Sequence, residues 1–325
     1  MTAIQVLDRP ASQSFYAVAG RLLFIETFNR DLGASLERLF AGWQLTPVSS
    51  PDRSPDVRIT FFDCQDLPEI PFRLGLTQFD VADGGRCFPT HDGFYLQFPN
   101  STLRLEEKTR VSASVFISVP TDVEFARVTS FAVCAALRRF GLFELHSGGA
   151  VVPETGDGVL IVGASGTGKS TLTLQLAKAG WGYLSDDELL LSVSGDEVEV
   201  RGFRNFFALA PAAARVGQQG ALKTCFEPAS VFATPPVSRA TPRFVLFTSI
   251  SGDSETRLSE LSQTETMTEL LRACPWATYD TAVAGPHLQL LSRLARQAKG
   301  FSLAAGTDLL EPDQAARIIR AACHA

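Results

Sequence analysis

The stretch Gly163-Ala164-Ser165-Gly166-Thr167-Gly168-Lys169-Ser170 decides the fold of this chain. It matches the pattern G-x-x-x-x-G-K-[ST] at every fixed position, and Thr171 continues it. Glycines at this spacing let the backbone curl so that successive N–H groups converge on phosphate oxygens. In such a loop the lysine, Lys169, neutralises β- and γ-phosphates, and the hydroxyl of Ser170 ligates Mg²⁺. The stretch therefore predicts a site for a nucleoside triphosphate.

The residues around this loop predict the strand and helix that such a loop connects. Residues 159–162 form a short apolar run typical of a buried strand. The helix opens from Ser165 onward and continues over residues 171–179, with Gly180 as its C-terminal cap. Its N-terminus adds a positive dipole end to the phosphate site. Two observations favour other structures: residues 171–176 alternate like a strand, and a glycine-rich hairpin without a ligand is the alternative to the loop.

Two adjacent carboxylates, Asp186 and Asp187, follow the next predicted strand, at residues 181–185. A helix of about 11 residues carries the chain roughly 16 Å away from the phosphate edge. A strand of about five residues returns it by a similar distance. The pair should therefore lie beside Lys169, where one carboxylate can hold a metal while the other accepts a proton from a hydroxyl. The alternative is that the pair only precedes a strand at residues 188–193 and faces water.

The rest of the chain predicts two domains, an N-terminal α+β domain at residues 1–140 and an α/β domain at residues 141–325. The first domain has strand patterns at residues 57–62, 94–98, 102–106 and 111–119 and helix patterns at residues 32–39 and 122–140. The second has strands at residues 149–152, 159–163 and 243–250 and helices at residues 264–273, 285–297 and 313–322. A cluster of Asp80, Asp83, Arg86 and His91 is interpreted as a solvated loop.

Composition excludes several classes of protein. The 325 residues are 45% hydrophobic and 20% charged, which is ordinary for a globular protein and excludes a disordered tail or a fibre. Apolar runs are shorter than the roughly 20 residues of a membrane-spanning helix, and a net charge of -6 disfavours nucleic acid as a partner. Six scattered cysteines without a C-x-x-C pair argue against a zinc site and a disulfide scaffold. With no secretory pattern in residues 1–10, we expect a cytoplasmic protein.

The order of the motifs resembles the catalytic domain of the HPr kinase/phosphorylase family. Phe143-Glu144-Leu145-His146 precedes two strands, the phosphate loop and its helix follow, and Leu184-Ser185-Asp186-Asp187 comes next. The resemblance covers about residues 140–319 and extends to HPr-kinase-like relatives, some of which act in lasso-peptide clusters. It implies a P-loop kinase domain of the HPr kinase/phosphoenolpyruvate carboxykinase-like type that uses ATP and Mg²⁺.

The resemblance also implies roles for single residues. Asp186 resembles the family's general base, and Asp187 resembles the second carboxylate near Mg²⁺, which Ser170 also ligates. His146 matches a histidine that lies near the phosphates and the base, although a lone histidine ending an apolar run is more typical of a core or capping residue. Asp186, His146 and Lys169 are thus the expected catalytic residues, and residues 163–171 the expected nucleotide site.

Two features depart from the family pattern. HPr kinases carry an acidic-Ile-Arg-Gly stretch well after the two aspartates, whereas Glu199-Val200-Arg201-Gly202 comes only about a dozen residues after them. We interpret it as part of a hairpin formed by residues 189–193 and 197–203. Residues 1–125 show no match to the N-terminal domain of HPr kinases, so HPr itself and the reverse phosphorolysis are not implied for this chain.

Three functions remain open from the sequence. The first is a Mg-ATP-dependent kinase for a hydroxyl, most simply Ser of a peptide or protein, with the N-terminal domain as a docking surface. The second is a small-molecule kinase, and the third is a nucleotide-sensing module without transfer. HPr kinases assemble into hexamers, so a homo-oligomer is an expectation that no motif here fixes.

A cationic residue that assists transfer is the last expectation. Four residues are candidates for stabilising the transferred phosphoryl group: Lys223, Arg204, Arg239 and Arg243. Each of them alone is more typical of a solvated surface residue. Lys223 lies in the proline-punctuated segment 218–242, which lacks clean periodicity and is interpreted as a long loop able to close over the nucleotide.

Overall fold

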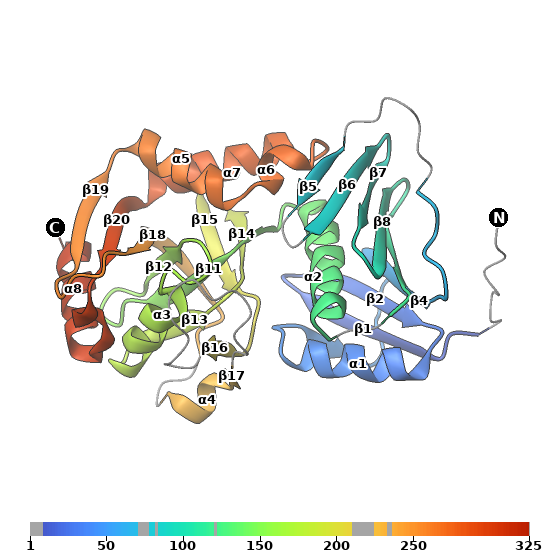
Figure 1. Cartoon of the computed structure of the whole chain (residues 1–325), viewed down its shortest axis with the longest axis horizontal. Helices are drawn as coiled ribbons and strands as arrows, with labels where there is room; N and C mark the ends of the chain where they lie inside the picture. Colours follow the sequence, from blue (N-terminus) through green and yellow to red (C-terminus); the bar gives the residue numbers. More distant parts are fainter. Residues whose placement is uncertain are drawn as a thin grey trace. The chain divides into compact units, whose positions relative to one another are not determined.

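The computed structural model describes residues 9–70, 78–81, 84–119, 122–209, 224–232 and 236–324. The chain divides into two compact units, Met1–Phe140 and Gly141–Ala325, named unit 1 and unit 2 below. Each unit joins a large sheet with helices, so the mixed α/β class is confirmed (Figure 1).

Unit 1 is built on one sheet, in which the described residues form nine strands in the order β3-β1-β2-β4-β9-β8-β7-β6-β5. Strand β4 pairs in parallel with β2 and β9, and the other neighbours are antiparallel. The elements are β1 (Ser12–Val18), β2 (Arg21–Thr27), α1 (Arg30–Ala41), β3 (Thr46–Val48), β4 (Val57–Asp63), β5 (Phe79–Val81), β6 (Gly85–Thr90), β7 (Gly93–Gln97), β8 (Ser101–Glu107), β9 (Val111–Ile117) and α2 (Asp122–Arg138).

The α-helices described in unit 1, α1 and α2, pack on the sheet through aromatic side chains. Phe40 of α1 meets Tyr16 of β1 edge-on at 5.0 Å between ring centroids, and Phe125 of α2 meets Phe61 of β4 at 6.3 Å. Strand β9 alternates buried and half-buried residues along its whole length, as expected for a strand with one face in the core.

The strands predicted at residues 57–62, 94–98, 102–106 and 111–119 correspond to β4, β7, β8 and β9, and the two predicted helices correspond to α1 and α2. The sequence patterns did not predict β1, β2, β3, β5 and β6. Asp83 lies outside the described residues, whereas Asp80 and Arg86 face each other in the β5–β6 pair and form an exposed ion pair at 3.3 Å.

Unit 2 also holds one large sheet, with the order β10-β14-β15-β18-β12-β11-β13 and with β20 between β18 and β19. Its strands are β10 (Phe143–Leu145), β11 (Ser147–Val151), β12 (Asp157–Val162), β13 (Gly182–Ser185), β14 (Leu189–Ser194), β15 (Glu197–Gly202), β18 (Arg239–Ile250), β19 (Arg257–Leu261) and β20 (Lys299–Ala305), and β16 (Phe207–Leu209) and β17 (Thr224–Phe226) form a separate pair. Its helices are α3 (Lys169–Lys178), α4 (Pro228–Val231), α5 (Gln263–Ala273), α6 (Trp276–Tyr279), α7 (Ala284–Gln297), η2 (Thr307–Leu310) and α8 (Pro312–His324).

Helices cover both faces of this sheet, which explains the continuous apolar run of β12. Val159 and Ile161 pack in one cluster with residues of α3 and α8, while Leu160 and Val162 pack in another with residues of α5 and α7. Alternate side chains of one strand therefore enter opposite cores, and every position from Gly158 to Val162 is buried.

Most expected elements of unit 2 are present, with two corrections. The helix expected from Ser165 begins at Lys169, because Gly166 and Gly168 have φ angles of +86° and +91°, which break a helix. The long loop expected at residues 218–242 is not continuous: its described part contains β17, α4 and the start of β18. Pro242 is tolerated inside β18 because the register with β12 shifts there, at Gly158.

In the described part of the chain, no helix is both long and apolar enough to cross a membrane.

Candidate functional site

The predicted phosphate loop connects β12 to α3 and is shaped by its glycines. Gly166 and Gly168 adopt left-handed backbone angles, which residues with a Cβ rarely adopt. Gly168 is also the N-cap of α3 and has no side chain to accept the first N–H groups of the helix. The loop and the N-terminus of α3 thus offer N–H groups suited to an anion.

A threonine of β18 supports the base of this loop. The Thr248 hydroxyl donates to the Val162 carbonyl at 3.1 Å and lies 2.9 Å from the Thr167 hydroxyl. A Cβ at Gly163 would come within 2.6 Å of either hydroxyl, so this position requires glycine. Thr248 was not predicted, and its signal was a polar residue ending an apolar strand.

Lys169 lies inside the loop. Its Nζ donates to the carbonyl oxygens of Gly163 at 2.7 Å and Ala164 at 3.0 Å, and the residue is only 6% exposed. The loop therefore holds the ammonium group at the place where phosphate oxygens would meet the N–H groups.

Three strand ends meet beside the loop because β11 runs antiparallel between β12 and β13. Ser147, the first residue of β11, pairs with Val162, the last residue of β12. Ser185, the last residue of β13, pairs with Gly149 of β11. The residues that follow β12 and β13 and the residue that precedes β11 therefore lie at one edge of the sheet. Helix α3 has 10 residues and β13 has four, close to the lengths used to predict this meeting.

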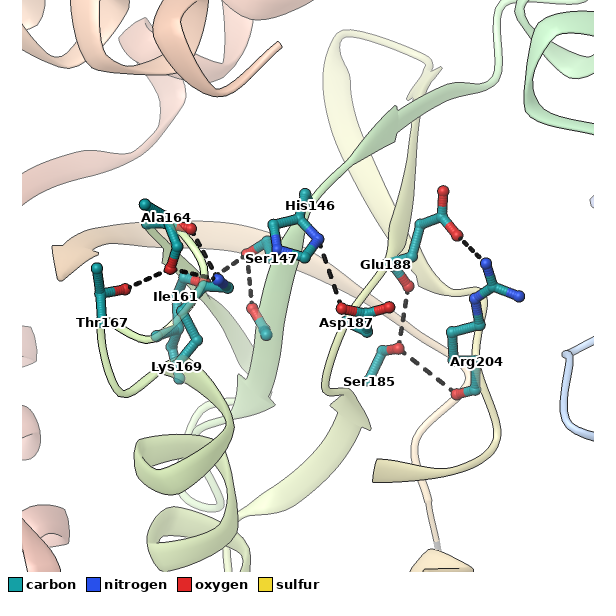
Figure 2. A network of polar contacts seen from close by, with 12 residues as sticks. His146, Ser147, Ile161, Ala164, Thr167, Lys169, Ser185, Asp187, Glu188 and Arg204 are labelled. Atoms are coloured by element: carbon teal, nitrogen blue, oxygen red, sulfur yellow. Dashed lines mark hydrogen bonds and ion pairs between the residues drawn. The ribbon is translucent and has the colours of Figure 1, made fainter. Parts of the chain in front are cut away.

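His146 lies between the phosphate loop and the acidic pair, as Figure 2 shows. Its Nδ1 is 3.5 Å from Oδ1 of Asp187, and both side chains are about half exposed, at 51% and 44%. His146 is therefore not a core residue, and it shares an open surface with Asp187.

Asp186 differs from its neighbour in being buried, with 2% of its surface exposed. Burial, and then the charges of Asp186 and Asp187, raise the pKa of the Tyr183 phenol well above its usual range. Tyr183 therefore stays protonated, and its hydroxyl donates to the Phe206 carbonyl at 3.2 Å. One carboxylate of the pair is thus enclosed and the other is open, which suits two different tasks.

A largely buried ion pair stands next to the acids. Arg204 Nη2 lies 2.6 Å from Oε2 of Glu188, with side-chain exposures of 9% and 15%. The Ser185 hydroxyl donates to the Glu188 carbonyl at 3.0 Å (Figure 2). The Phe203 N–H donates to the same carbonyl at 3.1 Å. These contacts fix the turn that carries Asp186 and Asp187 against the start of β14. Glu188 was not predicted, although an acid next to the aspartates was visible in the sequence.

Two of the other cationic candidates, Arg239 and Arg243, do not reach the site. Arg243 is near Asp157 at 3.9 Å and Glu197 at 2.5 Å, and Arg239 is near Glu199 at 3.5 Å. Asp157 begins β12, whereas the phosphate loop follows its last residue, so both arginines lie at the opposite edge of the sheet. Lys223 is outside the described residues. Of the three candidates that the structure describes, Arg204 is the one at the site.

The stretch 199–202 lies in the second strand of the predicted hairpin, because β14 and β15 pair from Leu189↔Gly202 to Ser194↔Glu197. Arg201 and Glu199 form an ion pair within it. The interpretation of this stretch as part of a hairpin is confirmed.

The residues expected to hold Mg²⁺ fit the chemistry of that ion. Ser170 lies in the first turn of α3, and the half-exposed carboxylate of Asp187 comes from the neighbouring strand end. Mg²⁺ is typically bound by one or two protein oxygens together with substrate phosphates and water. Among the described residues no group of three or more His, Cys, Asp and Glu could hold a metal ion.

A cleft with a volume of ≈ 590 Å³ opens beside the loop and is bordered by His146 and α5. Its wall includes the loop residues Gly163 and Ala164, and Glu269 and Arg272 of α5. The cleft combines apolar and polar groups, so it can accommodate a molecule beyond the phosphates.

Comparisons with known proteins agree with the predicted resemblance. No protein-family model matches the chain. The HPr kinase/phosphorylases of Chlorobium phaeovibrioides and Chlorobium luteolum are each 34% identical to it over 67 residues, which are 21% of this chain and 20% of each relative. The matched part therefore spans about a fifth of these curated relatives. The solved Hpr(Ser) kinase/phosphatase from Coxiella burnetii aligns with 12% identity and a TM-score of 0.32, over 56% of this chain and 99% of that chain. The chain is HPr-kinase-like over a partial region.

Proposed function

We propose that this protein is a Mg-ATP-dependent kinase that transfers the γ-phosphoryl group to a hydroxyl, with Ser of a peptide or protein as the acceptor. One observation carries the proposal: the phosphate loop, His146 and the two aspartates meet at one edge of the unit 2 sheet. A phosphate loop alone would serve many nucleotide-binding proteins. The enclosed carboxylate of Asp186 adds a group able to take a proton.

In this proposal the loop and Lys169 hold the nucleotide. The N–H groups of the loop bind the phosphate oxygens, and Lys169 turns from the Gly163 and Ala164 carbonyls to the β- and γ-phosphates. Ser170 and Asp187 would hold Mg²⁺, which neutralises charge that develops on the phosphate oxygens. His146, 3.5 Å from Asp187, helps to orient that carboxylate.

Asp186 is the proposed general base. The acceptor oxygen forms a bond to the γ-phosphorus while its proton passes to Asp186, and the bond between the γ-phosphorus and the β–γ bridging oxygen breaks to release ADP. The burial of Asp186 keeps bulk water away from the carboxylate, which favours transfer to the acceptor over hydrolysis. Arg204 and Glu188 hold the turn that carries this base.

A protein or peptide acceptor is supported by the partial match to proteins named HPr kinase/phosphorylase. The ≈ 590 Å³ cleft beside His146 is the proposed entrance for the acceptor. Because the reaction uses Mg-ATP, we place the protein in the cytoplasm. We propose no membrane partner and no nucleic acid partner, the latter because a net charge of -6 disfavours nucleic acid.

The proposal is tested by incubating the purified protein with Mg-ATP and candidate acceptors, followed by mass spectrometry. We expect phosphate on Ser of a peptide encoded near its gene, and none on the same peptide with that Ser replaced by Ala. Turnover of free serine or a sugar, with no peptide modified, would replace the peptide acceptor by a small molecule. Nucleotide binding without phosphate on any acceptor would leave the nucleotide-sensing alternative.

A further inference from the structure

A second cavity opens beside the first turn of α3, at the phosphate loop. Its volume is ≈ 190 Å³, and its walls come from the loop, from α3, from the segment after β18 and from the segment after β20. Gly168 and Thr171 border this cavity and also belong to the predicted nucleotide site. The cavity is therefore continuous with the proposed phosphate site, and no step of the proposed transfer uses it.

The wall of this cavity is almost wholly apolar. Leu172 and Leu303 form its buried part, and Ile250 and Leu310 form its rim. These rim residues are 45% and 53% exposed, although large aliphatic side chains gain free energy from being covered. An apolar surface that borders an anion site suits a ligand with a charged end and a flat apolar end.

Three of the five polar side chains at the cavity, those of Thr167, Thr248 and Asp253, already have partners within the protein. Thr167 and Thr248 share a hydrogen bond at 2.9 Å, and Thr248 donates to the Val162 carbonyl. The carboxylate of Asp253 is paired with Arg257 at 2.6 Å. These groups therefore have less capacity to read the edge of a ligand by hydrogen bonds.

The rim is also held in place by a set of hydrogen bonds. Asp308 accepts from the N–H and the hydroxyl of Thr256, at 3.0 and 2.5 Å, and the Gly306 N–H donates to that hydroxyl at 3.0 Å. A Cβ at Gly306 would come within 2.5 Å of the Glu255 backbone, so the two segments approach closely. The cavity is thus a preformed feature of unit 2.

We propose that this cavity takes the base and part of the ribose of the nucleotide, holds the base by apolar contact, and discriminates little between purines. The proposal rests on the proposed function for the phosphate site and extends it from ATP to purine nucleotides in general. A cavity of ≈ 190 Å³ is too small for a drug-sized ligand but fits one heterocycle with part of a sugar. Apolar pockets separate similar ligands by about 10- to 200-fold, whereas hydrogen-bonded sites reach about 10⁴-fold or more.

The experiment uses calorimetric titration of the whole chain with Mg-ATP, Mg-GTP and inorganic tripolyphosphate with Mg²⁺. We expect ATP and GTP to bind within about tenfold of each other and both to bind at least about tenfold more tightly than tripolyphosphate. The double variant Ile250→Ala, Leu310→Ala should weaken both nucleotides by about fivefold or more and leave tripolyphosphate unchanged. Both residues are exposed at the rim, and a thermal melt checks that the variant is folded.

The matched control is Val193→Ala, since Val193 is 48% exposed on β14, away from the cavity. It should bind all three ligands like the wild type. Nucleotides that bind no more tightly than tripolyphosphate, or a double variant with unchanged nucleotide affinity, would overturn the proposal. A strong preference for one purine would overturn the apolar readout and assign base recognition to a polar group such as Asp253.

The two proposals fail in different ways. If the protein binds nucleotides through this cavity but modifies no acceptor, the base site is supported and the proposed kinase function is wrong. If the protein binds neither nucleotides nor tripolyphosphate, both the proposed phosphate site and the base site that rests on it are wrong.

Discussion

Helix α1 of unit 1 and helix α3 of unit 2 begin in opposite ways. Helix α1 follows Asn29, whose side chain accepts hydrogen bonds from the N–H groups of Asp31 and Leu32 at 2.8 and 3.1 Å. Helix α3 follows Gly168, which has no side chain and a left-handed φ of +91°. A cap satisfies the helix from within, whereas a glycine leaves its N–H groups to a ligand. The difference separates a helix start that serves stability from one that serves binding.

The two sheets also differ in what they place at their edges. In unit 1, β5 to β9 form an antiparallel meander that brings mainly turns to its edges. In unit 2, β12 pairs in parallel with β18, which pairs in parallel with β20, and antiparallel β11 joins β12 to β13. The chain therefore brings a glycine loop, a histidine and two acids to one edge. Chemistry is expected in unit 2 and not at the exposed Asp80–Arg86 pair of unit 1.

The largest expected effect separates the acids of the two units. Asp186→Asn keeps the shape of the side chain but cannot accept a proton, so transfer should fall by about two to four orders of magnitude while Mg-ATP still binds. Asp80→Asn in unit 1 is the control and should change neither the transfer rate nor the binding of Mg-ATP.

Asp187→Asn should instead raise the Mg²⁺ concentration needed for transfer. Phosphotransfer rates and nucleotide titrations check all three variants, and normal transfer by Asp186→Asn would exclude Asp186 as the base.

The second effect concerns the cation inside the loop. Lys169→Ala removes the charge that the loop holds near Gly163 and Ala164, so Mg-ATP affinity should fall by about 10- to 100-fold, as expected for a hydrogen bond to a charged group. Titration calorimetry measures the change. Lys178→Ala, at the exposed end of the same helix, is the control, and equal losses in both variants would point to a general charge effect.

How far the sequence predicts the molecule differs between these regions. The motif predicts the strand, loop and helix order because loop glycines and the lysine act locally, and the helix overrides the alternating pattern of residues 171–176. The position of His146 depends on the antiparallel insertion of β11, a tertiary pairing that no local pattern carries. Arg239 and Arg243 lie at the surface, as the alternative for these candidates expected. The sequence could not choose Arg204 over them, because strand pairing decides which end of the sheet each arginine occupies.

Other misses have a different physical origin. In β2, residues from Leu22 to Ile25 form a continuous apolar run, which periodicity alone cannot assign to strand or helix. In β18, Pro242 reads as a strand breaker, and only the register shift opposite Gly158 makes it acceptable. Local rules thus fail where pairing with a distant strand decides the structure.

A third prediction concerns a variant in which α3 begins with the same residue type as α1. Gly168→Asn places at α3 the capping residue that α1 has, and asparagine tolerates a left-handed φ better than most residues. Its side-chain oxygen should compete with phosphate for the N–H groups of the helix and weaken tripolyphosphate and Mg-ATP by about tenfold. Gly180→Asn, at a left-handed position after the same helix, is the control. Unchanged phosphate affinity in Gly168→Asn would show that the start of α3 does not bind the anion.

The smallest effect is the reverse change in unit 1. Asn29→Ala removes the cap of α1 and the hydrogen bond from Asn29 Nδ2 to Asp63 at 2.6 Å. The free energy of unfolding should fall by about 0.5–2 kcal/mol, with transfer and nucleotide affinity unchanged. Urea denaturation followed by circular dichroism measures the free energy of unfolding. The phosphotransfer assay and the nucleotide titration described above measure transfer and affinity. A loss of transfer in a stably folded Asn29→Ala protein would contradict the assignment of chemistry to unit 2.

The pairing of β12 has a consequence for the order in which the chain acquires its activity during synthesis. The phosphate loop is complete once residue 170 has left the ribosome, but β18, which holds β12 and supplies Thr248, begins only at Arg239, and its own parallel partner β20 begins at Lys299. Parallel pairs between strands so far apart in sequence close large loops and form slowly. A nascent chain truncated before β18 should therefore lack nucleotide affinity although its motif is intact. Nucleotide affinity should therefore appear only late in synthesis, when unit 2 folds as a whole.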